Sequence, residues 1–227
     1  MFDESSTIDH HIQRHILDVL RRHEFARFRD MRPPAVDSNA YSYHLNRLIR
    51  QDYITKAPSG YTLSIKGLAY IDRMTTDDGR LRRQPKIMTA TVIADPEGQV
   101  LVRRKRAQPM INQVTLPTGM LHMDDPTVEA AARREVLEKM GITLPADIRH
   151  IGDCYMAIRH DGQVMMNTLI HVFYAPVWRS DIALHDGIFW RAPGDLADAA
   201  PATRHIVASL DALPADGLFF AEYSEDL

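Results

Sequence analysis

The residues with the clearest chemical potential lie in one stretch, residues 119–142, which reads GMLHMDDPTVEAAARREVLEKMGI. Glu135 and Glu138 are three positions apart in this stretch. On a helix, that spacing places two carboxylates close enough to share a hard divalent cation, which relieves their mutual repulsion. The same spacing is common on solvated helix faces, so by itself it leaves a metal site and an exposed face both open.

A single helix is predicted to position these two carboxylates. Asp125 followed by Pro126 is a typical N-cap and first-turn pair, and Gly141 is a typical helix stop. Apolar residues recur between them at four-residue steps, as expected for a face packed on a core: Val128, Ala132, Val136 and Met140. We therefore expect a helix over about residues 127–140, with the carboxylates on a neighbouring face.

The stretch resembles the signature of the Nudix hydrolase family: Gly, five residues, Glu, seven residues, then Arg-Glu-aliphatic-any-Glu-Glu-any-Gly-aliphatic. The match consists of Arg134-Glu135-Val136-Leu137-Glu138 and Gly141-Ile142, after Leu116-Pro117-Thr118-Gly119 where the family often has Pro-Gly-Gly. The resemblance covers about residues 85–220 and implies the Nudix α/β/α sandwich with a mixed sheet. It also implies a metal-dependent pyrophosphohydrolase that acts on a nucleoside diphosphate linked to another moiety.

The resemblance further implies a role for each matching residue. Glu135 and Glu138 would bind Mg²⁺ or Mn²⁺, and Arg134 would pair with a carboxylate of the same helix. The backbone carbonyl near Thr118 and Gly119 would supply another oxygen ligand. Arg134, Glu135 and Glu138 would form the catalytic set. The cation would neutralise the diphosphate of a nucleotide-like small molecule and lower the pKa of a bound water.

Two positions depart from the family pattern. The interval from Gly119 to Arg134 is one residue longer, so Asp124 or Asp125 would have to replace the isolated Glu. Lys139 stands where the second Glu of the pair usually ligates the metal, which removes an oxygen ligand and adds a positive charge. Lys139 could turn to solvent or replace part of the metal's charge. The alternative function is therefore a ligand-sensing transcriptional regulator with weak or no hydrolase activity.

Other residues are weaker candidates. The basic run at residues 103–106 could meet phosphate or be the solvated end of a hairpin, and Arg104 is its best candidate for substrate binding. Asp186 lies where the family often has a further metal carboxylate, although a turn residue is the simpler interpretation. We interpret His122 as structural. Three histidines of the N-terminal segment are interpreted as surface or interdomain residues: His10, His11 and His15.

Residues 1–78 are typical of a winged-helix domain. The predicted elements, in chain order, are a helix capped by Ser5, Ser6 or Thr7 that ends near Arg22, a short element at residues 25–31, a helix capped by Asp37 or Ser38, a hairpin over residues 53–63 and a closing helix over residues 65–74. This order is helix, helix, helix, hairpin. A polar stretch with Gly79 marks the boundary, so we expect a linker at residues 79–84 and a second domain over residues 85–227.

The third predicted helix offers a candidate surface for DNA. If Tyr41, Leu45 and Leu48 face inward, the outward side carries residue types that read base edges and phosphates: Asn39, Ser42, Tyr43, Asn46 and Arg47. Winged helices also serve as dimerisation or lid modules, so DNA and a second copy of the chain are both candidate partners.

The second domain is predicted to have an α+β fold. Its predicted strands and helices alternate: a hairpin over residues 87–102, the helix described above, strands over 148–158, 167–177 and 188–191, and a helix over 202–210. The turn between the two long strands is expected at Asp161 and Gly162.

Length and composition agree with two modest domains. The chain has 227 residues, 45% of them hydrophobic and 25% charged, which disfavours disorder and coiled coil. It has no apolar run near ~18 residues and an acidic start, so we expect a cytoplasmic location without a membrane partner. Cys154 is the only cysteine, which excludes a disulfide framework. Residues 1–84 carry 14 basic and 11 acidic side chains, and residues 85–227 carry 13 and 19.

Overall fold

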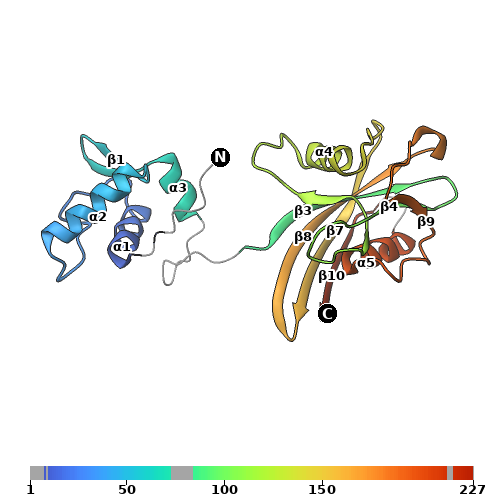
Figure 1. Ribbon diagram of the computed structural model, residues 1–227. Coiled ribbons are helices and arrows are strands. Elements are labelled where there is room, and N and C mark those ends of the chain that lie inside the picture. Colours follow the sequence, from blue (N-terminus) through green and yellow to red (C-terminus); the bar gives the residue numbers. More distant parts are fainter. Residues whose placement is uncertain (1–7, 9, 73–83, 214–216, 227) are drawn as a thin grey trace. The chain divides into compact units, whose positions relative to one another are not determined.

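The computed structural model describes residues 8, 10–72, 84–213 and 217–226. The chain divides into two compact units, residues 1–84 and 85–227 (Figure 1). Each unit contains its own hydrophobic core. Several predicted features lie outside the described residues: the caps at Ser5, Ser6 and Thr7, the end of the closing helix at Met74, and the linker apart from Gln84. No helix among the described residues is long and apolar enough to cross a membrane.

The N-terminal unit consists of helices and a two-stranded hairpin, in an order consistent with the predicted winged helix. Its elements are α1 (His11–Arg21), α2 (Ser38–Arg50), the hairpin strands β1 (Ile54–Ala57) and β2 (Gly60–Leu63), and α3 (Ile65–Ile71). Asp37 caps α2, because its carboxylate accepts hydrogen bonds from the backbone N–H groups of Asn39 and Ala40 at 2.8 and 3.0 Å. The helices pack around a core that includes Ile16, Leu17, Tyr41 and Leu48.

Two predictions for this unit are wrong. The short element at residues 25–31 is not a helix: Ala26 forms a β-bridge with Tyr61, and turns follow it. The bridge forms because Gly60 lets the two backbones approach; a Cβ at Gly60 would lie 2.5 Å from the Ala26 carbonyl oxygen. The first helix also begins later than predicted, at His11, where His10 supplies the capping nitrogen.

The C-terminal unit is built on one mixed sheet. Its elements are β3 (Lys86–Ala94), β4 (Val100–Arg104), β5 (Val114–Thr115), β6 (Thr118–Met120), α4 (Val128–Met140), β7 (Arg149–His160), β8 (Gln163–Pro176), the 3₁₀ turn Arg179–Asp181, β9 (Ile188–Arg191), α5 (Pro201–Ser209), the 3₁₀ turn Leu210–Ala212 and β10 (Phe219–Asp226). The strand order is β10-β7-β8-β3-β4-β5, with β6 paired to β3 and β9 paired to β4. The β3–β8 and β10–β7 pairs are parallel and the other pairs are antiparallel.

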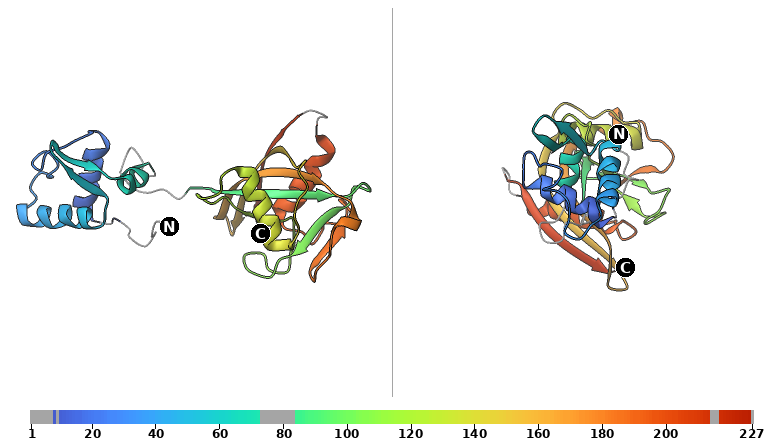
Figure 2. Two further views of the ribbon diagram at one scale, coloured as in Figure 1. Left: turned by 90° about the horizontal axis from the view of Figure 1, so that it is seen from above. Right: turned by 90° about the vertical axis from the view of Figure 1, so that its left-hand side faces the viewer.

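Helices cover both faces of this sheet (Figures 1 and 2). Val136 and Met140 of α4 pack with Ile93 of β3 on one face. Ile206 and Val207 of α5 pack on the other face, in a separate cluster. Successive residues of a strand point to opposite faces, so β3 contributes to both clusters. The α/β/α sandwich with a mixed sheet predicted from the family resemblance is confirmed.

Candidate functional site

Helix α4 starts later than the Asp125-Pro126 pair predicts. The N-cap is Thr127, whose hydroxyl accepts a hydrogen bond from the N–H of Ala130 at 3.0 Å. Asp125 cannot serve as the cap, because its carboxylate accepts hydrogen bonds from the N–H of His122 and from Arg134. Gly141 ends the helix in the left-handed conformation, at φ +69°.

Glu135 lies on the buried side of α4, with only 4% of its surface exposed. Its carboxylate lies directly against the α-carbon of Gly119: a Cβ there would come within 1.7 Å of the Glu135 Cδ and within 2.2 Å of both oxygens. Glycine at position 119 is therefore what makes room for the carboxylate. The Thr118 carbonyl, beside this glycine, faces the same place, since Lys139 bonds to it and contacts Glu135 as well.

Arg134 organises the acidic groups around it. Its guanidinium donates two hydrogen bonds of 2.8 Å to the two oxygens of Asp125 and a third of 2.8 Å to Glu135 Oε1. It also bonds to the carbonyl of Met120 and lies 3.4 Å from Glu138 Oε2. These hydrogen bonds hold the pKa of the Asp125 carboxyl well below its usual value. Of the two aspartates considered from the sequence, the structure places Asp125 in this network.

Lys139 turns inward rather than to solvent. Its ammonium lies 2.6 Å from Glu135 Oε2 and donates a hydrogen bond to the carbonyl oxygen of Thr118. The contact with Oε2 is ionic, because that buried oxygen accepts no well-aligned hydrogen bond. The ammonium thus lies between two of the oxygen atoms that the family resemblance assigns to a metal.

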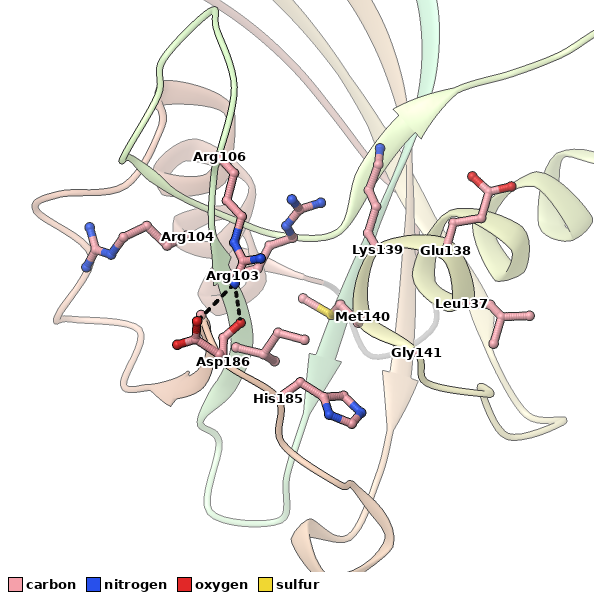
Figure 3. A pocket seen from close by; sticks show the side chains of 12 residues that line it. Arg103, Arg104, Arg106, Leu137, Glu138, Lys139, Met140, Gly141, His185 and Asp186 are labelled. Atoms are coloured by element: carbon pink, nitrogen blue, oxygen red, sulfur yellow. Dashed lines mark hydrogen bonds and ion pairs between the residues drawn. The ribbon is translucent and has the colours of Figure 1, made fainter.

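A pocket of about 290 Å³ adjoins this network (Figure 3). Its lining includes Arg103, Arg104 and Arg106 from the end of β4 and the loop after it, Glu138 and Lys139 from α4, and His185. Burial lowers the pKa of the Arg103 guanidinium, and the nearby Arg106 lowers it further. Such a concentration of positive charge favours an anionic ligand.

The basic residues of the pocket differ in orientation. Arg104, the residue that sequence analysis favours, points away from α4 in Figure 3, and its guanidinium bonds to the Asn112 carbonyl at 2.6 Å and to Asp198 at 3.3 Å. Arg106 pairs with Asp186 at 3.2 Å, so Asp186 belongs to the same pocket. His185 also lines the pocket, and sequence analysis did not find it because it lies in an irregular segment without periodicity.

The outward face of α2 is arranged as its periodicity predicts. Tyr41, Leu45 and Leu48 are buried. The candidate DNA-contacting residues lie on the other side, where four are exposed and Ser42 is partly exposed: Asn39, Tyr43, Asn46 and Arg47. Elsewhere in the unit, the His10 ring stacks on His44 with centroids 3.7 Å apart, and burial lowers the pKa of both imidazoles.

The chain matches the family model of the NUDIX domain over residues 85–210. Similar solved structures include the MutT protein of Bacillus halodurans, with 19% identity over 62% of this chain and 90% of that chain and a TM-score of 0.49. The NUDIX domain of Shewanella oneidensis NrtR, crystallised with ADP ribose, has 14% identity over 64% of this chain and 96% of that chain, with a TM-score of 0.48. A Burkholderia pseudomallei MutT NUDIX hydrolase has 24% identity over 56% of this chain and 98% of that chain, with a TM-score of 0.46.

No curated protein matches the chain. The family match covers more than half of the sequence, and it contains α4 and every residue of the pocket.

Proposed function

Because this chain belongs to the Nudix family, we propose that its C-terminal unit binds a nucleoside diphosphate linked to another moiety, as the ligand-sensing part of a transcriptional regulator. The contact that carries this proposal is the Lys139 ammonium, held between the Thr118 carbonyl and the Glu135 carboxylate. An ammonium offsets the charge of the buried glutamate, but it cannot activate a water molecule as a divalent cation does.

The residues around Glu135 fit a hard divalent cation only in part. The buried Oε2 accepts no hydrogen bond, and the carboxylate rests on Gly119 near the Thr118 backbone carbonyl, so two oxygen atoms of the kind that a hard cation prefers lie close together. The Lys139 side chain, however, occupies the space between these oxygens. With Lys139 turned inward, the donor set does not fit Mg²⁺ or Mn²⁺ at this position.

The pocket supplies the chemistry for the ligand. Arg103 and Arg106 present guanidinium groups, which are the usual partners of phosphate oxygens, and Lys139, whose ammonium is held by Glu135 and Thr118, adds positive charge to the same pocket. Arg106 already holds Asp186, so a diphosphate would compete with that carboxylate. The net effect is a site whose fixed cations recognise a phosphoanhydride without a metal.

Hydrolysis is the second candidate function, and the preserved network of Arg134, Glu135 and Glu138 favours it. In that case Glu135, Glu138 and the carbonyl at Thr118 or Gly119 would hold Mg²⁺ or Mn²⁺, with Lys139 displaced. The cation would supply charge neutralisation and an activated water.

A ligand screen separates the two functions. We expect a nucleotide sugar, dinucleotide or nucleoside triphosphate to bind in the presence of EDTA, by calorimetry, without release of phosphate. In the same assay Arg103→Gln should weaken binding by about tenfold or more, because a charge-assisted hydrogen bond is lost. Arg104→Gln is the matched control and should change little, since its guanidinium is engaged by Asn112 and Asp198. Binding and turnover that both require metal would replace this proposal with the hydrolase.

We also propose that α2 contacts DNA. Arg47→Ala should weaken binding to duplex DNA and lower the slope of log affinity against log salt by about 1, because one phosphate contact is lost. Fluorescence anisotropy at several salt concentrations measures both quantities. Arg29→Ala is the control, since Arg29 is exposed on a turn of the same unit and paired with Asp30. Equal salt slopes for the parent and Arg47→Ala would exclude this surface.

A further inference from the structure

A second group of polar side chains lies on the sheet, apart from the carboxylates of α4. His150 Nε2 and His171 Nδ1 lie 3.0 and 2.7 Å from the same atom, Asp153 Oδ1. All three ligand atoms lie within 4.8 Å of one another, and the three residues are partly buried. Two imidazoles and one carboxylate are a donor set for borderline divalent metals.

The backbone brings these residues together in a specific way. Asp153 and His171 are direct partners across β7 and β8, so their side chains share a face. His150 is three positions before Asp153, and in a regular strand it would point to the opposite face. A β-bulge between His150 and Gly152 removes this difference and turns His150 toward Asp153.

Gly152 is what permits the bulge. Its φ is +153°, a conformation that side chains of L-residues rarely adopt, and a Cβ there would lie 2.3 Å from the Phe219 carbonyl oxygen of β10. The bulge also sets His150 opposite Phe173, with ring centroids 5.5 Å apart, which limits the imidazole orientation. The cluster is therefore held by strand register, a bulge and a packed ring.

We propose that His150, Asp153 and His171 bind a divalent transition metal, and specifically Zn²⁺. Zinc takes nitrogen and oxygen ligands at about 2.0–2.2 Å in a tetrahedron, which separates neighbouring ligand atoms by about 3.4 Å. The observed separations of 2.7 and 3.0 Å need to widen only slightly. A neutral imidazole carries its one proton on either ring nitrogen. When the proton is on the nitrogen that points away from Asp153, the nitrogen that points toward Asp153 can bind the metal, and the charge of the ring does not change.

This site differs from the one that the Nudix signature implies, and it does not depend on the proposed ligand. In the sheet, Gly119 pairs with Thr89, and Thr89 pairs with His171. The cluster thus shares a face of the sheet with Glu135 but lies two strands from Gly119, about 10 Å away at the usual strand spacing. Three protein ligands leave the fourth zinc position open to water or to a bound molecule.

The test uses the full chain and zinc chloride alone. Calorimetric titration should find one zinc site in the parent that is missing in Asp153→Asn and in His171→Ala. We expect each variant to lose at least about tenfold in affinity, since even partners outside the ligand shell commonly contribute that much. His160→Ala is the matched control, because His160 is also a histidine of β7 but lies outside the cluster.

Two further measurements test whether the variants are folded and whether the metal is coordinated tetrahedrally. Thermal unfolding without metal shows that each variant is folded, and His150→Gln serves if a variant is not. Cobalt in place of zinc gives visible absorption bands that report tetrahedral coordination, and these bands should disappear in His171→Ala. The N-terminal histidines can also take up zinc, so the result is read from the difference in zinc stoichiometry and affinity between the parent and the variants. Equal stoichiometry and affinity in the parent and both ligand variants would reduce the cluster to a hydrogen-bonded group and overturn the proposal.

Discussion

Lys139→Glu should make the C-terminal unit depend on a divalent cation for its stability. In the parent, the ammonium contacts the buried Glu135 carboxylate. The substitution removes this charge and places a second carboxylate beside the first. We expect a loss of about 3 kcal/mol in the free energy of unfolding in EDTA, at the lower end of the cost of breaking a buried ion pair, because Lys139 is partly exposed. Millimolar Mg²⁺ or Mn²⁺ should restore most of this loss by binding only the folded state.

Chemical unfolding with and without metal measures both effects. Lys139→Met is the matched control, since it removes the ammonium without adding an oxygen ligand. It should be destabilised, and it should gain less stability from Mg²⁺ or Mn²⁺ than Lys139→Glu does, because it offers the metal one carboxylate fewer. The stability of the parent should not change with Mg²⁺ or Mn²⁺. If Lys139→Glu is as stable in EDTA as the parent, the ammonium does not stabilise Glu135, and the case for a metal-independent sensor is lost. A parent that is strongly stabilised by Mg²⁺ would support the hydrolase instead.

Gly119→Ala should lower the free energy of unfolding at least as much as Lys139→Glu does in EDTA. The added Cβ would overlap the Glu135 carboxylate, which Arg134 and Lys139 hold from two sides. Either the carboxylate leaves its place or β6 shifts away from α4. Both outcomes break the buried ion pairs, so we expect a loss of about 3 to 5 kcal/mol together with the loss of ligand binding.

Two control variants test whether overlap with the Glu135 carboxylate causes the loss of stability in Gly119→Ala. Gly194→Ala is the control, because no atom lies within 4 Å of the Cβ position at Gly194; its stability should stay within about 0.5 kcal/mol of the parent. Combining Gly119→Ala with Glu135→Ala removes the overlap, so the double variant should lose less than the sum of the single variants. Additive losses would mean that Gly119 has another role.

Helices α2 and α4 could be predicted because their signals, apolar periodicity and a capping residue, lie within a short stretch of sequence. The apolar residues of α4 recur at four-residue steps, and those of α2 bury Tyr41, Leu45 and Leu48, so both helices could be predicted. Asp37 is a cap in sequence and in structure. The family signature supplied the sheet arrangement, which single-strand patterns do not determine.

Contacts between distant residues could not be predicted. Asp125 looks like a helix cap, but Arg134, nine residues later, takes its carboxylate and leaves the cap to Thr127. The direction of Lys139 depends on the Thr118 carbonyl, which lies 21 residues earlier. The histidine cluster on β7 and β8 depends on a bulge, and a strand pattern assumes strict alternation.

The two faces of the central sheet differ in a way that bears on how such a protein can evolve. Facing α5, the strands present mainly apolar side chains at the core positions, among them Ala90, Val92, Cys154 and Val172. Facing α4, the row through Thr89, His171 and Asp153 is polar. Alternation along each strand keeps the two sets apart, so a lineage can exchange residues of the polar row while the opposite layer preserves the margin of stability. New ligand preferences could thus arise in this scaffold by substitutions that leave half of its core untouched.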